Sequence, residues 1–254
     1  MIFAASPAIV GHRGYGAGQP GGYRENSLES FLAAAGSGLR WVELDARRTA
    51  DDELVLWHDP VTPAGQFIVA RTAEQVAAEG IIRLEDVLTA LPPQVGVDID
   101  VKCVLEDATD PVPRRTHALV LAMLREYRET RPLLVSSFDP SLVAFLLQRR
   151  GELGDAMAFG LITESFFSAE VALSAAANLG AGAVCVHTGT LGLHRTEVSA
   201  ADRPAAAIIA AAHRAGLTVM AWSPTPPEAA ELAAAGIDAV CVNDVPGAQT
   251  VLAG

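Results

Sequence analysis

Short apolar runs recur along the chain, and the segments between them carry apolar residues every three or four positions. A period of two is typical of strands, and a period near 3.6 is typical of amphipathic helices. The runs predict strands at residues 8–12, 41–48, 95–102, 133–138, 156–162, 183–187, 217–222 and 239–242. The intervening segments predict helices near residues 26–36, 84–91, 114–127, 139–150, 165–179, 204–215, 227–235 and 246–252.

This alternation of strand and helix predicts an α/β protein with parallel strands and crossover helices. Eight such units in 254 residues fit a closed (β/α)₈ TIM barrel, so we expect a single domain over residues 1–254. A doubly wound open sheet is the alternative. The turn after the first strand reads Gly11-His12-Arg13-Gly14 and lacks the GxGxxG spacing of a dinucleotide site, which disfavours that sheet.

The second predicted strand belongs to a longer stretch, Trp41 to Asp59, that returns on itself. Glu43 and Asp45 share one face of the strand, a polar turn follows at 49–52, and residues 54–58 form a short returning strand that ends in His58. Taken alone, the stretch also fits a surface hairpin with a polar outer face. We expect this hairpin to lead into a short cap insertion, irregular in structure, at about residues 60–80.

The strand at 95–102 decides which face of the hairpin points inward. Its apolar residues alternate with Asp98, Asp100 and Lys102. Because helices cover the outside of a barrel, the apolar side chains should point outward and the charged ones into the barrel, together with Glu43 and Asp45. Asp98 lies deeper than Asp100, and we expect it to be a structural partner of Lys102 or Arg47.

The composition limits the kinds of molecule that the protein is expected to bind. Acidic residues outnumber basic ones by 30 to 18, giving a net charge of −12, which argues against nucleic-acid backbones and anionic membranes. The chain shows no signal peptide and no apolar run long enough to span a membrane. Three widely spaced cysteines read as buried free thiols rather than a disulfide framework. We therefore expect a cytoplasmic protein, without stable membrane association, that acts on a small molecule.

Functional groups in barrels of this kind collect where strands end, and here those ends are polar. An all-oxygen set of Glu43, Asp45 and Asp100 suits a hard divalent cation, Mg²⁺ or Ca²⁺. Basic side chains beside such a cation form an anion site that fits a phosphate. Histidines at the same rim suit proton transfer near neutral pH. The residues thus predict metal-assisted cleavage of a phosphate ester. Arg13 and Lys102 would bind the phosphate, and His12 and His58 would transfer protons.

The sequence resembles the glycerophosphodiester phosphodiesterase family over nearly its whole length. The resemblance implies a TIM barrel that uses a divalent cation to hydrolyse glycerophosphodiesters to an alcohol and glycerol 3-phosphate, through attack of the glycerol 2-hydroxyl and a cyclic phosphate. It also implies catalytic roles for His12 and His58, phosphate contacts for Arg13 and Lys102, and metal ligation by Glu43, Asp45 and Asp100. The motifs that carry it are HRG at 12–14, EN at 25–26, ELD at 43–45, HD at 58–59, RLEDVL at 83–88, DVK at 100–102, SSFDP at 136–140, AHRAGLTVMAW at 212–222 and AGIDAVCVNDVP at 235–246.

Three features depart from the family pattern. The family usually carries Glu where this chain has Asp100, whose carboxylate is shorter by about one C–C bond, on the order of 1.5 Å. The cap insertion is short, and the family's WTVN after the seventh strand reads WSPT at 222–225. An aspartate also stands at this place in sphingomyelinase D-like phospholipases, so a lysophospholipase D or sphingomyelinase D-like activity is one alternative. A non-catalytic phosphate-binding module is another.

A long apolar rim around the site would favour a lipid substrate, but the loops show no clear aromatic or aliphatic patch in the sequence. We expect Phe138 and Trp222 to form pocket walls and Glu25 to contribute either to the site or to the first turn of a helix. Either Asn26 or Ser27 is expected to cap that helix. His187 occupies a rim position but belongs to no family motif, so it is a candidate site residue without an assigned role.

Overall fold

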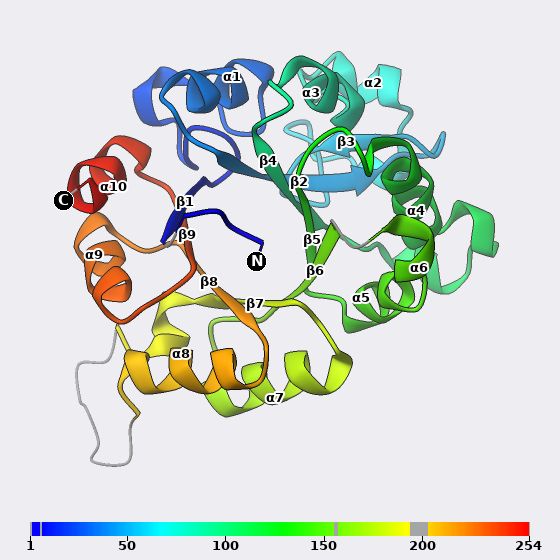
Figure 1. The fold of residues 1–254 in the computed structure, drawn as a ribbon. Helices are drawn as coiled ribbons and strands as arrows, with labels where there is room; N and C mark the ends of the chain where they lie inside the picture. The colour runs from blue at the N-terminus through cyan, green and yellow to red at the C-terminus, as the bar shows by residue number, and fades with distance from the viewer. Residues whose placement is uncertain (1, 6, 155–156, 194–202, 254) are drawn as a thin grey trace.

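The computed structural model describes residues 2–5, 7–154, 157–193 and 203–253 (Figure 1). Eight parallel strands close into a barrel, because β1 (Ala8–Gly11) pairs with both β2 (Trp41–Arg48) and β9 (Ala239–Val242). A further strand, β3 (Leu54–Leu56), runs antiparallel to β2 and forms the predicted hairpin. This topology confirms the TIM barrel over the doubly wound sheet. The remaining barrel strands follow β2 in the order β4 (Gly96–Val101), β5 (Leu133–Ser137), β6 (Met157–Ile162), β7 (Ala183–His187) and β8 (Thr218–Trp222).

Helices form a ring around the barrel (Figure 1). Their apolar faces pack against outward-facing strand residues such as Val42, Leu44, Val97 and Ile99, all of which are buried. The alternation of β2 and β4 therefore has the orientation that the sequence predicts. The helices are α1 (Leu28–Gly36), α3 (Leu84–Ala90), α4 (Thr116–Tyr127), α5 (Pro140–Leu147), α6 (Arg150–Leu153), α7 (Ala169–Leu179), α8 (Ala205–Arg214), α9 (Pro226–Ala234) and α10 (Val245–Leu252).

Two segments differ from the sequence prediction. The helix expected at 139–150 is α5, which ends at Leu147, and a separate short helix, α6, begins at Arg150. The insertion expected to be irregular contains a 3₁₀ turn, η2 (Ile68–Ala70), and a helix, α2 (Ala73–Ala77). The side chain of Thr72 accepts a hydrogen bond from Gln75 N, and the side-chain oxygen of Gln75 accepts one from Thr72 N. This capping box, a Thr followed three residues later by Gln, stabilises a helix start that the sequence already contains.

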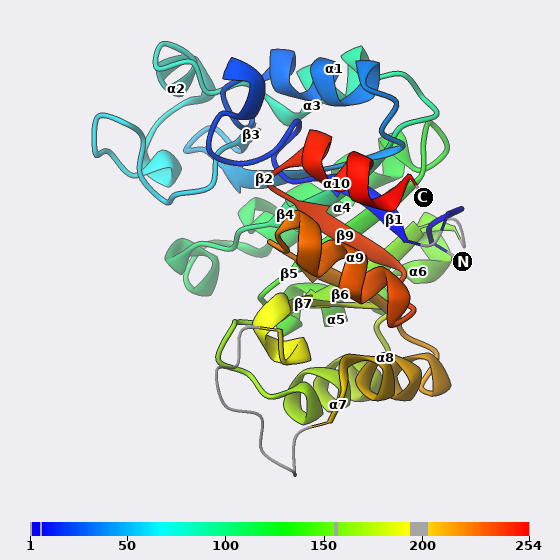
Figure 2. The ribbon, with the colours of Figure 1, turned by 90° about the vertical axis from the view of Figure 1, so that its left-hand side faces the viewer.

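A second apolar core fills the barrel interior and closes its amino-terminal end. Phe3, on the segment before β1, is buried and packs edge-on against Trp41, with ring centroids 4.9 Å apart. Other inward-facing residues, including Leu134 and Met220, complete this core. Figure 1 views the barrel from this end, with the amino-terminal segment lying across it. Figure 2 shows the barrel from the side, with the loops that follow the carboxyl ends of the strands on the left.

A buried arginine anchors one of these loops. Arg48, at the end of β2, is 1% exposed, and its Nη2 lies 2.5 Å from Asp110 Oδ2. Its Nε lies 3.4 Å from Asp107 Oδ1, and its Nη1 lies 3.8 Å from Asp52 Oδ1. The loop between β4 and α4, with its 3₁₀ turns η3 (Leu105–Ala108) and η4 (Val112–Arg114), is thereby tied to the β2–β3 hairpin.

Candidate active site

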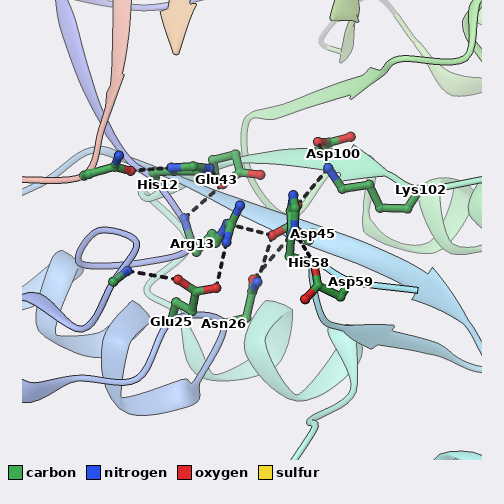
Figure 3. A network of polar contacts seen from close by, with 12 residues as sticks. His12, Arg13, Glu25, Asn26, Glu43, Asp45, His58, Asp59, Asp100 and Lys102 are labelled. Carbon is green, nitrogen blue, oxygen red and sulfur yellow. Dashed lines mark hydrogen bonds and ion pairs between the residues drawn. The ribbon is translucent and has the colours of Figure 1, made fainter. Parts of the chain in front are cut away.

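The turn after β1 places a histidine and an arginine at the carboxyl end of the barrel (Figure 3). Arg13 adopts a left-handed backbone conformation with φ of 55°, and Gly14 has φ of 104°. Gly14 N donates to Gly11 O at 3.2 Å, so the turn is tight. A Cβ on Gly11 would lie 1.9 Å from Gly14 O, which explains why glycine stands there. His12 and Arg13 therefore leave the strand in a fixed direction, and Arg13 N donates to Glu43 Oε2 at 2.9 Å.

Three buried carboxylates converge on neighbouring strands. The parallel register pairs Asp45 with Asp100, and Glu43 lies two residues before Asp45 on the same inward face. One oxygen from each of Glu43, Asp45 and Asp100 lies within 4.8 Å of the others. Asp100 Oδ1 is buried and has no hydrogen-bond partner among the described residues. The fold thus brings the three expected ligands together. Their oxygens, one of which has no hydrogen-bond partner among the described residues, fit a hard divalent cation.

Two cationic side chains border this trio. Lys102 Nζ lies 3.0 Å from Asp45 Oδ1 and forms a second ion pair with Asp100. Arg13 Nε lies 3.2 Å from Asp45 Oδ2. Burial acts to raise the pKa of Asp45, but Lys102 and Arg13 outweigh it and bring the pKa to about 2. By contrast, burial and the neighbouring carboxylates raise the pKa of Glu43. Added positive charge would stabilise this group of acids in their ionised form.

The two predicted histidines occupy different environments. His12 is largely buried, its Nδ1 lies 2.5 Å from Asn243 Oδ1, and its Nε2 lies 3.8 Å from Glu43 Oε2. Burial and the charge of Arg13 lower the pKa of His12 to about 4, so its imidazole is neutral at pH 7. His58 has a side chain that is 43% exposed, and its Nδ1 lies 2.9 Å from Asp59 Oδ1. One histidine is thus enclosed and the other is open to solvent.

Residues 25 and 26 support the site from the loop before α1. Glu25 accepts a hydrogen bond from Arg13 Nη1 at 2.7 Å, so it holds the arginine and lies outside the acidic trio. Of the two expected caps of α1, Ser27 is the one that forms, because its side chain accepts the hydrogen bond from Ser30 N. Instead, Asn26 Nδ2 donates to Asp45 Oδ2 at 2.9 Å and orients that carboxylate.

The deeper aspartate has a different partner from the ones expected. Ser136 Oγ donates to Asp98 Oδ1 at 2.7 Å, whereas Arg47 donates to the carbonyl oxygen of His58. Burial raises the pKa of Asp98 to about 8, so the side chain is protonated at neutral pH. The prediction of an Asp98 ion pair with Lys102 or Arg47 is therefore wrong. Asp98 is therefore a neutral, hydrogen-bonded side chain in the barrel interior, below the three carboxylates, and we assign it a structural role.

An aromatic wall faces the charged groups across a pocket of about 680 Å³. The wall consists of Phe138 and Trp222, whose ring centroids are 6.4 Å apart, and both residues line the pocket as predicted. Lys102 Nζ lies 5.3 Å from the centre of the Phe138 ring. His187 packs behind the wall with its ring 4.5 Å from that of Trp222, and its Nδ1 accepts from Gly189 N at 3.0 Å.

Asn243 is a site residue that lies in the motif at 235–246 but has no expected role from the sequence. It follows β9 and therefore lies at the carboxyl end of the barrel beside β1, where it holds His12. Its position at a strand end was the available signal. The Trp222 indole Nε1 is buried and has no hydrogen-bond partner in the described part of the chain, so its donor is available to a ligand.

The model of the glycerophosphoryl diester phosphodiesterase family matches residues 12–246, a range that contains each of these site residues. The chain belongs to this family. Among curated relatives, the "Probable glycerophosphodiester phosphodiesterase 2" of Mycobacterium tuberculosis is 33% identical over 121 residues, covering 42% of this chain and 46% of that protein. Glycerophosphocholine phosphodiesterase gde1 of Schizosaccharomyces pombe is 45% identical over 56 residues, which is 20% of this chain and only 5% of that protein.

Solved structures of similar proteins share the fold. A glycerophosphodiester phosphodiesterase from Parabacteroides distasonis superposes with a TM-score of 0.77 at 18% identity, covering 98% of both chains. A phosphodiesterase from Oleispira antarctica, solved in complex with the product sn-glycerol-3-phosphate, superposes with a TM-score of 0.72 at 20% identity and the same coverage. Within the described residues, no helix has the length and apolar character needed to cross a bilayer.

Proposed function

We propose that this protein hydrolyses glycerophosphodiesters to an alcohol and glycerol 3-phosphate, and that it does so as a single cytoplasmic domain. One observation carries the proposal. Two histidines, two basic side chains and three buried carboxylates line the same pocket at the carboxyl end of the barrel. Membership of the family supports the reaction class, and the product-bound relative supports the kind of substrate.

Glu43, Asp45 and Asp100 are the residues that would hold a divalent cation, Mg²⁺ or Ca²⁺. When bound, the cation supplies positive charge for the phosphoryl oxygens in the transition state. The open Oδ1 of Asp100 fits this role despite the shorter side chain. Lys102 neutralises part of the acidic cluster through Asp45 and Asp100, so it holds the carboxylates in place and presents its ammonium group to the phosphate.

The first step uses one histidine on each side of the phosphorus. Arg13 and Lys102 bind the phosphate oxygens and orient the diester. The neutral His12 accepts the proton of the glycerol 2-hydroxyl as its oxygen forms a bond to phosphorus. The bond from phosphorus to the leaving alcohol breaks, and protonated His58 gives that oxygen a proton. The products are the free alcohol and a cyclic glycerol phosphate.

The second step reverses the proton transfers. His58, now neutral, accepts a proton from water as the water oxygen bonds to phosphorus. The bond to the 2-hydroxyl oxygen breaks, and His12 returns the proton to it. Glycerol 3-phosphate leaves, and both histidines regain their starting protonation. The enclosed position of His12 and the solvent-exposed position of His58 fit these two roles.

Replacing either histidine with asparagine tests the assignment. We expect each variant to lower kcat on glycerophosphocholine by about 10²–10⁴-fold, the usual contribution of a general acid or base. His213, whose Nε2 lies 2.8 Å from Asp238 Oδ2 on the outside of the barrel, provides the matched control. His213→Asn should keep normal turnover. Near-normal turnover by His12→Asn or His58→Asn would refute the assignment, and turnover of any diester by the native chain would exclude a non-catalytic binding module.

A further inference from the structure

Lys102 is the single lysine of the chain, and it lies among the carboxylates that would hold a cation (Figure 3). Its Nζ lies 3.0 Å from Asp45 Oδ1 and forms a second ion pair with Asp100 Oδ2. The other oxygen of Asp45 is also engaged, because it accepts a hydrogen bond from Asn26 Nδ2 and lies 3.2 Å from Arg13 Nε. The ammonium group therefore occupies part of the place where a divalent cation would bind.

The two roles assigned to Lys102 require two positions of its ammonium group. A divalent cation held by the three carboxylates takes oxygens of the same two aspartates that Lys102 contacts. Two positive charges at such short range repel each other. Binding of the cation should therefore loosen the ion pairs of Lys102 and move its ammonium group away from the carboxylates. The groups within reach of the side chain then decide where the ammonium group goes.

The ring of Phe138 is one such group. Lys102 Nζ lies over this ring, 5.3 Å from its centre. An aromatic face attracts a cation within about 6 Å of its centre. Phe138 lines the catalytic pocket, and its ring meets that of Trp222 edge to face with centroids 6.4 Å apart. A displaced ammonium group can thus approach the ring without leaving the pocket that is proposed to bind the phosphate.

Acidic side chains that line the pocket are the competing destinations. Asp139 lies at the start of α5, where its Oδ1 already accepts hydrogen bonds from both N and Oγ of Ser141. Asp59 contacts the imidazole of His58 at 2.9 Å. Glu164 lines the pocket from the loop after β6, but it is exposed to solvent, where water weakens the attraction between opposite charges. The contacts therefore favour the ring over these acids.

We propose that Phe138 is a positioning residue for Lys102, and that its ring receives the ammonium group when a bound divalent cation displaces it from the carboxylates. This inference rests on the cation site and the phosphate-binding role in the proposed function. Lys102 then has two positions, one beside the carboxylates and one closer to the ring. In the first it neutralises part of the acidic cluster, and in the second its charge is free to bind the phosphate.

Lysine-specific NMR tests the proposal. A protein labelled with carbon-13 at the lysine ε-carbon gives a signal from one side chain, because the chain contains one lysine. Lys102→Met should lack this signal, which confirms the assignment. Protons that lie over an aromatic ring are shifted upfield by its ring current. On titration with Mg²⁺ or Ca²⁺, we expect the ε-methylene protons of Lys102 to move upfield and to saturate together with the binding heat measured by calorimetry.

Matched substitutions separate the ring from other properties of the side chain. Phe138→Leu keeps an apolar side chain but has no ring, so it should abolish the upfield movement and weaken cation binding by about twofold to fivefold, the value of one cation–π contact. Phe138→Tyr keeps an aromatic face and should restore both. Phe167→Leu is the matched control, because Phe167 is also 37% exposed and lies in the loop after β6. This control should behave like the native chain.

The outcomes are distinguishable. If calorimetry detects no binding of Mg²⁺ or Ca²⁺, the cation site of the proposed function fails and the inference fails with it. If the cation binds but the Lys102 signal stays in place, or moves equally in Phe138→Leu, the role of Phe138 is refuted and the cation site stands. Loss of the movement in Glu164→Gln but not in Phe138→Leu would also refute it and show that the ammonium group moves to an acid. Turnover of glycerophosphocholine is measured separately, so a failure of the phosphodiesterase activity is not confused with these results.

Discussion

Arg47 donates two hydrogen bonds to the main-chain carbonyl oxygen of His58, from Nε at 2.9 Å and from Nη2 at 2.5 Å. The arginine is 8% exposed and extends from β2, two residues beyond Asp45. The imidazole of His58 is half-exposed and contacts Asp59, a residue that is itself exposed. The backbone of His58 is therefore held more firmly than its ring, and Arg47 sets the place from which the ring reaches the substrate.

Loss of this anchor should impair turnover more than binding. For Arg47→Met we expect kcat on glycerophosphocholine to fall by about tenfold to a hundredfold, the range seen when a reacting group is displaced by about 1 Å. KM should change little, and Arg47→Lys, with a single ammonium donor, should restore part of kcat. Steady-state kinetics measures all three. Arg40→Met, at an exposed position just before β2, is the control, and a kcat for Arg47→Met equal to that of the control would contradict the anchoring role.

Asn243 should govern the tautomer of His12. Because Asn243 Oδ1 accepts from Nδ1, the proton sits on Nδ1 and Nε2 keeps its lone pair for the substrate. Asn243→Ala removes the acceptor, and we expect kcat to fall by about tenfold to a hundredfold, as for other residues that orient a reacting ligand. Asn243→Asp keeps an acceptor and should lose less. Nitrogen NMR of the His12 ring reports the tautomer directly, and an unchanged ring signal in Asn243→Ala would disprove the hypothesis.

The two aspartates of β4 should respond differently to a cation. Asp100→Asn removes a proposed ligand, so we expect the affinity for Mg²⁺ or Ca²⁺ to fall at least tenfold. Asp98→Asn replaces a protonated acid that bonds to Ser136, and the affinity should stay within about twofold. Titration calorimetry after chelation measures both.

Chelation with EDTA should abolish turnover, and readdition of Mg²⁺ or Ca²⁺ should restore it. Activity that survives exhaustive chelation would rule out the metal role. Equal losses of affinity in the two asparagine variants would rule out Asp100 as the distinguishing ligand.

The buried arginine of the β2–β3 hairpin should matter for stability. Arg48→Met leaves Asp107 and Asp110 without their cation and Asp52 with Arg114 alone. These carboxylates are partly buried, so we expect the free energy of unfolding to fall by about 1–3 kcal/mol. Arg114 also contacts Asp52, but its side chain is 46% exposed. Arg114→Met should therefore cost less than about 1 kcal/mol. Urea unfolding of both variants measures these changes. Equal losses in the free energy of unfolding would show that the buried Arg48 contributes no more to stability than the exposed Arg114.

The sequence predicts the barrel because the strands show a clear alternation of polar and apolar residues. In β2 and β4, each inward carboxylate alternates with an outward apolar residue, and the register then places Asp45 beside Asp100. Short elements and the ends of helices were less predictable. The helix α2 was missed although Thr72 and Gln75 form a capping box, and the helix expected at 139–150 ends at Leu147 and is followed by the short α6. Local side-chain hydrogen bonds such as this capping box help to decide where a helix begins and ends. The periodicity of apolar residues does not reveal them.

Contacts between distant segments could not be predicted from spacing. Asn26 reads as a helix cap until the fold brings it to Asp45, and Asn243 meets His12 across 231 positions. The exposed apolar side chains Leu105 and Phe166 could not be grouped from the sequence for the same reason, because they stand in separate loops. The parallel strand order places both loops at the carboxyl end of the barrel.

Phosphorus NMR of glycerophosphocholine incubated with the protein and Mg²⁺ or Ca²⁺ is a direct test of the proposed hydrolysis. We expect loss of the diester signal, a transient five-membered cyclic phosphate and growth of glycerol 3-phosphate, with an equal amount of free choline. Phosphocholine and glycerol as products would show that the opposite ester bond breaks, and an unchanged diester in the presence of the cation would show that the site does not perform this reaction.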